Sequence, residues 1–262
     1  MLHSLTDRWS VLDFDACNCP WEGGMPFPRI VKSAPARRDE ILDAAQRLFA
    51  RNGYDSTSVS QIIAAVGVSK GAFYHHFESK EDLVEALACR YARQTAALTE
   101  AELSDPTLDA FSKLAGFLGT MRRHKTETAA ELRATFEPMF RAENLQLFER
   151  TQRAVTEVVQ PILTRIIVEG VAEQTFDTPD PQGAAETIMH LMTSNRELIV
   201  ELYQTRDRLH FERLSQRLLD KMEYLGTVID RILGLPEGSI ELADRSALDA
   251  LACTLDRPPT AA

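Results

Sequence analysis

The residues whose side chains could do chemistry gather in one short stretch, "SKGAFYHHFESK", at positions 69–80. Lys70 can reach a phosphate or the edge of a guanine, because its ammonium is a donor on a long flexible stem. Tyr74 and His75 can donate hydrogen bonds to phosphates, and such contacts set the register of a protein on a duplex without reading its sequence. Lys80 offers a further cation for a phosphate. These residue types at this spacing favour binding to nucleic acid.

Two other clusters raise the possibility of a metal site. His75 and His76 are adjacent, but neighbours on a helix project about 100° apart and rarely share a metal. The segment Cys17-Asn18-Cys19 places two thiols beside Trp21, without a histidine or further cysteine nearby. We therefore expect no metal and no cofactor, and we interpret this segment as part of an unstructured leader.

Other function classes find little support. The sequence has no H-E-x-x-H pattern and no glycine-rich phosphate loop, so we expect a protein that is not an enzyme. Four cysteines in 262 residues do not make a disulfide framework. No apolar run approaches the roughly 18 residues of a membrane span, and no basic-then-apolar leader stands at the N-terminus. We expect a cytoplasmic chain that has no membrane partner.

The total charge of −10 argues at first against nucleic acid, but the charges are unevenly distributed. Residues 29–80 hold eight Lys and Arg against five Asp and Glu, a net charge of +3, which leaves −13 on the rest of the chain. A basic segment on an acidic body fits a small nucleic-acid-binding head on a larger domain with another task. An excess of this size is also common on an ordinary solvated face.

The stretch 69–80 is predicted to lie among short helices. Apolar residues recur every three or four positions from Arg37 onward, which predicts an amphipathic helix that ends at Asn52-Gly53. A short helix from about 59 to 65 is broken by Gly67, and Ser69 caps the next helix, which extends to about 77. Ser79 followed by Asp82 predicts a capping box at the start of a fourth helix.

Two short helices joined by a glycine-containing turn form the helix-turn-helix signature, whose second helix enters the major groove of DNA. Gly67 permits the tight turn, while Gly71 and Ala72 keep the second helix slim enough for the groove. Ser69 leaves backbone N–H groups free at a positive helix end. The apolar contacts of the three-helix core are predicted to come from Val59, Ile62, Val68, Phe73 and Phe77.

The run "ILDAAQRLFARNGYDSTSVSQIIAAVGVSKGAFYHHFESKEDLV" resembles the DNA-binding domain of TetR-family transcriptional regulators. The resemblance covers residues 37–84, about a fifth of the chain. It implies an all-helical homodimer with an N-terminal operator-binding domain and a C-terminal domain that dimerises and often binds a small effector. By this resemblance the residues at or near DNA are Ser58, Ser69, Lys70, Gly71, Ala72, Tyr74, His75 and Lys80. The chain departs from the family pattern at Ile63 and Val66, which are bulkier than usual, and at Ala72, which lacks a common hydroxyl.

The predicted fold class is all-α, because no segment alternates with a period of two. We expect a flexible extension over 1–34, a helix-turn-helix domain over 35–95, and an effector-binding and dimerisation domain over 96–262. Residues 1–24 are either dispensable or an artefact of a true start at Met25. The basic residues that follow are either an arm on DNA or a plain tail; they are Arg29, Lys32, Arg37 and Arg38.

The C-terminal part reads as helices throughout, with a kink or restart expected at Pro161. The apolar stripes of 185–203 and 208–233 are the predicted dimer interface. Polar residues on otherwise apolar helices are the candidates for an effector pocket, although each also fits a structural role; they are His124, His190, Asn195 and Arg196. We expect a ligand-responsive repressor that binds a pseudo-palindromic operator, the alternative being a DNA-binding protein whose C-terminal domain binds another protein.

Overall fold

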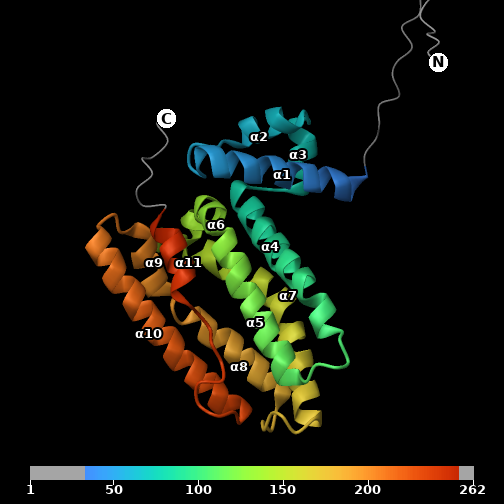
Figure 1. The fold of residues 1–262 in the computed structure, drawn as a ribbon. Coiled ribbons are helices and arrows are strands. Elements are labelled where there is room, and N and C mark those ends of the chain that lie inside the picture. Colours follow the sequence, from blue (N-terminus) through green and yellow to red (C-terminus); the bar gives the residue numbers. More distant parts are fainter. Residues whose placement is uncertain (1–32, 254–262) are drawn as a thin grey trace, which may run out of the picture. The chain divides into compact units, whose positions relative to one another are not determined.

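The computed structural model describes residues 33–253, and every regular element in that range is helical (Figure 1). The all-α prediction is confirmed. Three helices come first and form what we call the head (residues 34–77): α1 (Ala34–Asn52), α2 (Val59–Val66) and α3 (Lys70–His76). The predictions about Cys17, Cys19, Met25, Arg29 and Lys32 concern residues outside the described range.

The head folds as its local signals predict. Gly53 and Gly67 end α1 and α2 with positive φ angles of 81° and 72°, a region that favours glycine. Ile62 and Phe73 are completely buried, Phe77 is nearly so, and Val59 and Val68 pack against the same cluster. The three helices therefore share one apolar core, and Phe73 and Phe77 fix the inner side of α3 to it.

The remaining elements form the body (residues 80–252). Four long helices carry most of it: α4 (Lys80–Leu103), α5 (Ala110–Glu127), α7 (Leu145–Ala172) and α10 (Arg208–Leu233). Shorter ones are α6 (Ala129–Phe136), the 3-10 turns η1 (Glu137–Phe140) and η2 (Ala142–Asn144), α8 (Pro181–Thr193), α9 (Arg196–Gln204) and α11 (Arg245–Ala252). α4 packs on α5 and α7, and α7 packs on α8.

The structure adds to the expectations about the body at three points. α7 runs through Pro161 without a restart. The stripe 185–203 is divided between α8 and α9, because Ser194 and Asn195 lie between them, and both residue types have low helix propensity. α6, η1, η2 and α11 are elements that the sequence pattern did not predict.

The expected boundary at residue 95 falls inside α4, which is continuous from Lys80 to Leu103. The core of the head also extends into the body, because Met139, Leu147 and Phe148 belong to the same buried cluster as Phe73. Among the described residues, no helix is long and apolar enough to cross a membrane.

Candidate nucleic-acid interface and internal cavity

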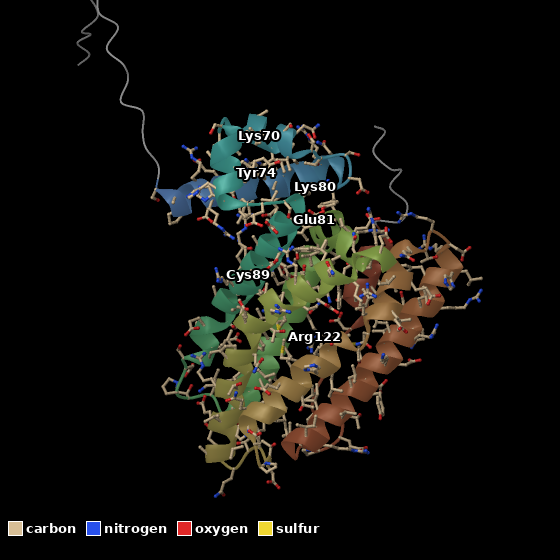
Figure 2. All side chains as sticks on the ribbon, turned by 180° about the vertical axis from the view of Figure 1, so that it is seen from behind. Lys70, Tyr74, Lys80, Glu81, Cys89 and Arg122 are labelled. Carbon is tan, nitrogen blue, oxygen red and sulfur yellow. The ribbon has the colours of Figure 1, made fainter. Side chains whose placement is uncertain are left out.

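Lys70 and Tyr74, two of the predicted DNA-contacting residues, both lie on α3 (Figure 2). Six of the eight candidates have exposed side chains or backbone; they are Ser58, Ser69, Lys70, Gly71, Tyr74 and His75. Tyr74 is 45% exposed although the neighbouring Phe73 ring is fully buried. The Lys70 ammonium lies 5.9 Å from the centre of the Tyr74 ring, so the cation and the phenol share one face of the helix. Ala72 is half-buried and lies between them in sequence.

Two serines fix where the helices of this unit begin. The Ser58 hydroxyl accepts a hydrogen bond from the Gln61 backbone N–H at 3.2 Å, and the Gln61 side chain accepts one from the Ser58 N–H at 2.7 Å. This reciprocal pair is a capping box, which satisfies two donors at the start of α2. Ser69 accepts from the Ala72 N–H at 3.1 Å and caps α3.

The stretch Gly67-Val68-Ser69-Lys70-Gly71 also matches the G-x-S-x-G pattern of serine hydrolases letter by letter. That pattern needs a strand before the serine, and an exposed nucleophile on a strained turn. Here a helix precedes it, no strand occurs in residues 33–253, and the Ser69 hydroxyl is engaged as a helix cap. The match therefore describes a turn between two helices.

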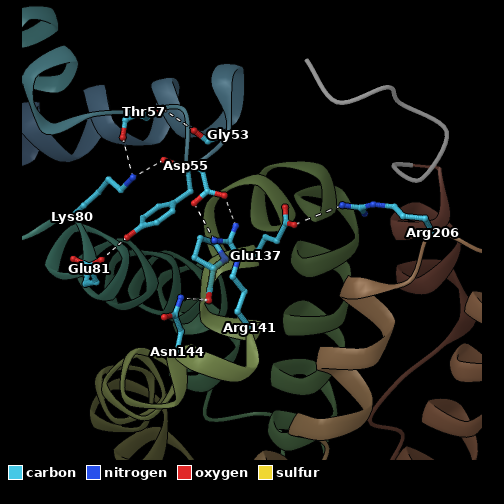
Figure 3. A network of polar contacts seen from close by, with 11 residues as sticks. Gly53, Asp55, Thr57, Lys80, Glu81, Glu137, Arg141, Asn144 and Arg206 are labelled. Carbon is cyan, nitrogen blue, oxygen red and sulfur yellow. Dashed lines mark hydrogen bonds and ion pairs between the residues drawn. The ribbon is translucent and has the colours of Figure 1, made fainter. Parts of the chain in front are cut away.

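Lys80 has a different position from the one expected of a phosphate contact (Figure 3). Its ammonium donates to the backbone carbonyls of Tyr54 and Thr57 at 2.8 and 3.0 Å. It also lies 3.9 Å from the centre of the Tyr54 ring, and burial lowers the pKa of its side chain. Lys80 thus holds the loop between α1 and α2 from the inside, and this arrangement gives the phosphate assignment no support.

Of the basic residues expected to form an arm or tail, Arg37 and Arg38 lie within α1. Arg37 pairs with Glu40 at 2.7 Å, and the exposed Arg38 has its guanidinium 4.9 Å above the ring of Phe77. Burial lowers the pKa of His76, helped by the nearby charges of His75 and Arg38. Across the described part of the chain, no group of three or more His, Cys, Asp or Glu is placed to hold a metal.

The body contains a cavity of about 300 Å³ that no sequence candidate identified. Its wall comes from α4 to α10 and is mostly apolar, with Phe117, Phe136 and Met139 among the lining residues. The polar residues of the wall are Tyr91, Thr95, Arg122, Lys125, Thr151, Gln152 and Tyr203. A concave, mainly apolar site with few polar groups is the usual form of a small-molecule pocket.

The four pocket candidates lie elsewhere. His124 stacks on Tyr91 at 4.8 Å and lines a second hollow of about 170 Å³, which shares Tyr91, Leu132 and Phe136 with the larger cavity. Its Nε2 is buried without a hydrogen bond in the described part of the chain. His190 is exposed on α8. Asn195 is buried and donates to the sulfur of Met222 at 3.0 Å.

Arg196 is half-buried, with its guanidinium 5.0 Å from the Phe148 ring and one N–H donating to the Arg141 carbonyl at 3.3 Å. None of the four candidates lines the larger cavity. Its lining includes Leu118, Met121 and Val155, whose helical spacing in the sequence equally fits an ordinary core, and Lys125, which fits a solvated face.

Ion pairs join the head to the body (Figure 3). Arg141 follows η1 and makes a two-pronged contact with the carboxylate of Asp55, at 3.0 and 2.5 Å. Its guanidinium hydrogen bond holds the pKa of Asp55 below the usual value. Arg90 of α4 pairs with Asp43 of α1 at 2.6 Å. Inside the body, Arg150 of α7 contacts Asp82 at 2.6 Å and Glu85 at 2.8 Å, at the beginning of α4.

Comparison with known proteins agrees with this geometry. Residues 41–87 match the sequence profile described as "Bacterial regulatory proteins, tetR family". A transcriptional repressor of Mycobacterium tuberculosis, Rv1474c, is 30% identical over 171 residues, which is 58% of this chain and 89% of the relative. The repressor AcnR of Corynebacterium glutamicum is 33% identical over 138 residues, 51% of this chain and 67% of the relative.

Solved structures share the fold. The crystal structure of RolR with its ligand resorcinol covers 86% of this chain and 95% of its own, with a TM-score of 0.55 and 16% identity. RolR without ligand covers 84% and 97%, with a TM-score of 0.53. Three findings agree: the head matches the family profile, the mycobacterial repressor aligns over most of its own length, and the all-helical fold is shared. The chain therefore belongs to the TetR family and is a DNA-binding transcriptional regulator.

Proposed function

We propose that the chain is an effector-responsive repressor that binds a pseudo-palindromic operator as a homodimer, in the cytoplasm. The observation that carries this proposal is the outer face of α3, where Lys70, Tyr74 and His75 are exposed over a buried aromatic core. A face of this kind can enter a major groove while Phe73 and Phe77 keep the helix fixed to the head.

The contacts are divided by role. Lys70 is placed to reach a phosphate or a guanine edge, and Tyr74 and His75 to donate to phosphates. Ser58 and Ser69 bring the starts of α2 and α3 to the duplex, and Gly71 and Ala72 keep the approach free of bulk. Lys80 contributes indirectly, because it holds the loop that orients α2.

The homodimer is proposed to form through α8 and α10. α10 carries Tyr224, which is 66% exposed, and its mostly apolar buried side, which also contains Ser215 and Asp230, anchors it to the body. Two such helices from each subunit would form a four-helix bundle, an interface compatible with two-fold symmetry.

Effector response is proposed to start in the cavity. Phe136, Met139 and Phe140 line it, and Arg141 follows directly and holds Asp55 of the head. A ligand that displaces η1 would therefore move the link to the loop before α2. RolR binds resorcinol in a chain of the same fold, which supports a ligand-binding role for this body. The open cavity favours this reading over a body that only binds another protein.

Footprinting on the DNA upstream of the chain's own coding region tests the proposal. The expected result is two protected half-sites whose centres lie about one helical turn, ~34–36 Å, apart, or a multiple of that distance. Protection of a single half-site would contradict the dimer, and uniform protection without a preferred site would contradict sequence-specific binding.

A further inference from the structure

The wall of the cavity has an uneven charge. Two cations line it, Arg122 and Lys125, and none of the described lining residues is acidic. Arg122 is already engaged, because its guanidinium donates to the Glu241 backbone carbonyl and lies 3.3 Å from the Glu241 carboxylate. Within residues 33–253, no acidic side chain lies within ion-pair distance of Lys125 and no hydrogen bond to its ammonium is found. Lys125 is thus the one cation of the described wall that is left for a ligand.

Lys125 lines the cavity and is at the same time an exposed residue. Its side chain keeps free surface, yet desolvation by the surrounding protein lowers the pKa of its ammonium. Both observations agree if the free surface faces the cavity. A cation held in such a place without a partner is unfavourable, and an anion beside it would relieve that cost.

A second polar group on the wall also lacks a partner. Thr151 of α7 is 2% exposed, and its hydroxyl is buried without a hydrogen bond in the described structure. Buried hydroxyls are normally hydrogen-bonded, so this one is an unsatisfied polar group in the wall, although the oxygen itself exposes almost no surface to the cavity. The remaining wall offers rings and thioethers, among them Phe117, Phe136 and Met139.

From these three features we propose that the cavity binds a monoanionic amphiphile, a molecule with one carboxylate beside Lys125 and an apolar body among Phe117, Phe136 and Met139. This inference rests on the proposed effector-binding function and specifies its ligand class. The volume of about 300 Å³ limits the size. It equals that of roughly ten water molecules at ~30 Å³ each, which suits a ligand of about ten to twelve non-hydrogen atoms.

Calorimetric titration of the full-length protein with decanoate and decanol tests the proposal, because the two differ mainly in the charge of the head group. Wild type is expected to bind decanoate about tenfold more tightly or better, the size of one hydrogen-bonded charge contact. Lys125→Met should abolish this preference while still binding decanol, and Lys125→Arg should retain it. Lys221→Met removes the same charge from outside the cavity and should leave the preference unchanged.

Folding controls accompany the titration. Lys125→Met should melt at the wild-type temperature or above it, because methionine requires no desolvated charge. Three results would overturn the proposal that the ligand is anionic. They are equal binding of the two amphiphiles by wild type, binding of neither, and a preference for decanoate that survives Lys125→Met.

Operator binding measured on the same wild-type preparation, without any amphiphile, separates the two proposals. A protein that binds its operator but shows no preference for decanoate refutes the ligand class alone. A protein that binds decanoate through Lys125 but does not bind operator DNA refutes the proposed repressor function and leaves the ligand class standing.

Discussion

Arg141 and Asp55 form a two-pronged ion pair that links the residue after η1 to the loop before α2. Arg141 is immediately preceded by Phe140, which lines the cavity, and Asp55 is followed three residues later by Ser58, the cap of α2. The pair therefore stands between the place where a ligand would bind and the place where DNA would be contacted. It is partly exposed, so its contribution to global stability is on the order of 0.2–1 kcal/mol.

Removing this link should loosen the head more than it unfolds the protein. We expect Arg141→Met to speed hydrogen exchange of backbone amides over residues 53–59, while the melting temperature changes by no more than a few degrees. Exchange measured by mass spectrometry checks this. Arg231→Met is the matched control, since it removes a surface pair with Glu237 at the end of α10. Unchanged exchange over 53–59 in Arg141→Met would show that the pair does not restrain the loop.

The same pair predicts a dependence of stability on pH. The guanidinium lowers the folded-state pKa of Asp55, so its stabilisation is complete above the ordinary value of about 3.9 and is lost as pH falls through the lowered one. Urea unfolding of wild type and Asp55→Asn should therefore differ most at pH 6–7, by about 0.2–1 kcal/mol, and converge towards pH 3. Asp39→Asn, at an exposed position on α1, should show no such convergence. A constant difference at every pH would exclude this electrostatic origin.

Lys80 is predicted to matter for the fold of the head and not for phosphate binding. Lys80→Met leaves the carbonyls of Tyr54 and Thr57 without their donor, which should lower the free energy of unfolding by about 1–3 kcal/mol. Denaturant unfolding measures this loss. The slope of operator affinity against salt should stay at the wild-type value in conditions where the variant is folded. A slope reduced by about one unit with unchanged stability would restore the phosphate assignment.

The dimer can be tested on the outer side of α10. A charge at an apolar interface is costly, so Tyr224→Asp should weaken dimerisation by tenfold or more, on the order of 1.4 kcal/mol. Leu98→Asp, at a position on α4 that is 58% exposed, is the control and should leave dimerisation unchanged. Analytical ultracentrifugation over a concentration series distinguishes the two. Loss of the dimer in the α4 variant alone would move the interface away from α8 and α10.

The head was predictable because its determinants are local. Gly53 and Gly67 occupy left-handed positions, Ser58, Ser69 and Ser79 cap the helices that follow them, and Phe73 recurs with the helical period. Each of these signals acts within about four residues, so the sequence alone carries it. The structural role of Lys80 was not predicted, because the carbonyls that it contacts lie 23 and 26 positions away in the sequence.

The cavity was not predictable, because the residues that form it are far apart in the sequence. Its wall is assembled from helices that are distant in the sequence, and Lys125 or Thr151 looks like an ordinary polar residue until those helices are packed. Asn195 was predicted to line a pocket because it lies in an apolar stripe. In the structure it lies between α8 and α9, and its side chain donates a hydrogen bond to the sulfur of Met222 on α10. Arg141 lies between two 3-10 turns, where periodicity gives no signal.

The central claim is that the exposed face of α3 contacts DNA, and operator affinity measured over a salt series tests it most directly. Between ~50 and 200 mM salt, Lys70→Ala should bind the upstream DNA more weakly than wild type and reduce the slope of log affinity against log salt by about one. Tyr74→Phe should weaken binding by a few-fold, because it removes only one neutral hydrogen bond. Wild-type affinity and an unchanged slope in both variants would contradict the assignment of this face, and no binding by wild type at ~50 mM salt would contradict the account as a whole.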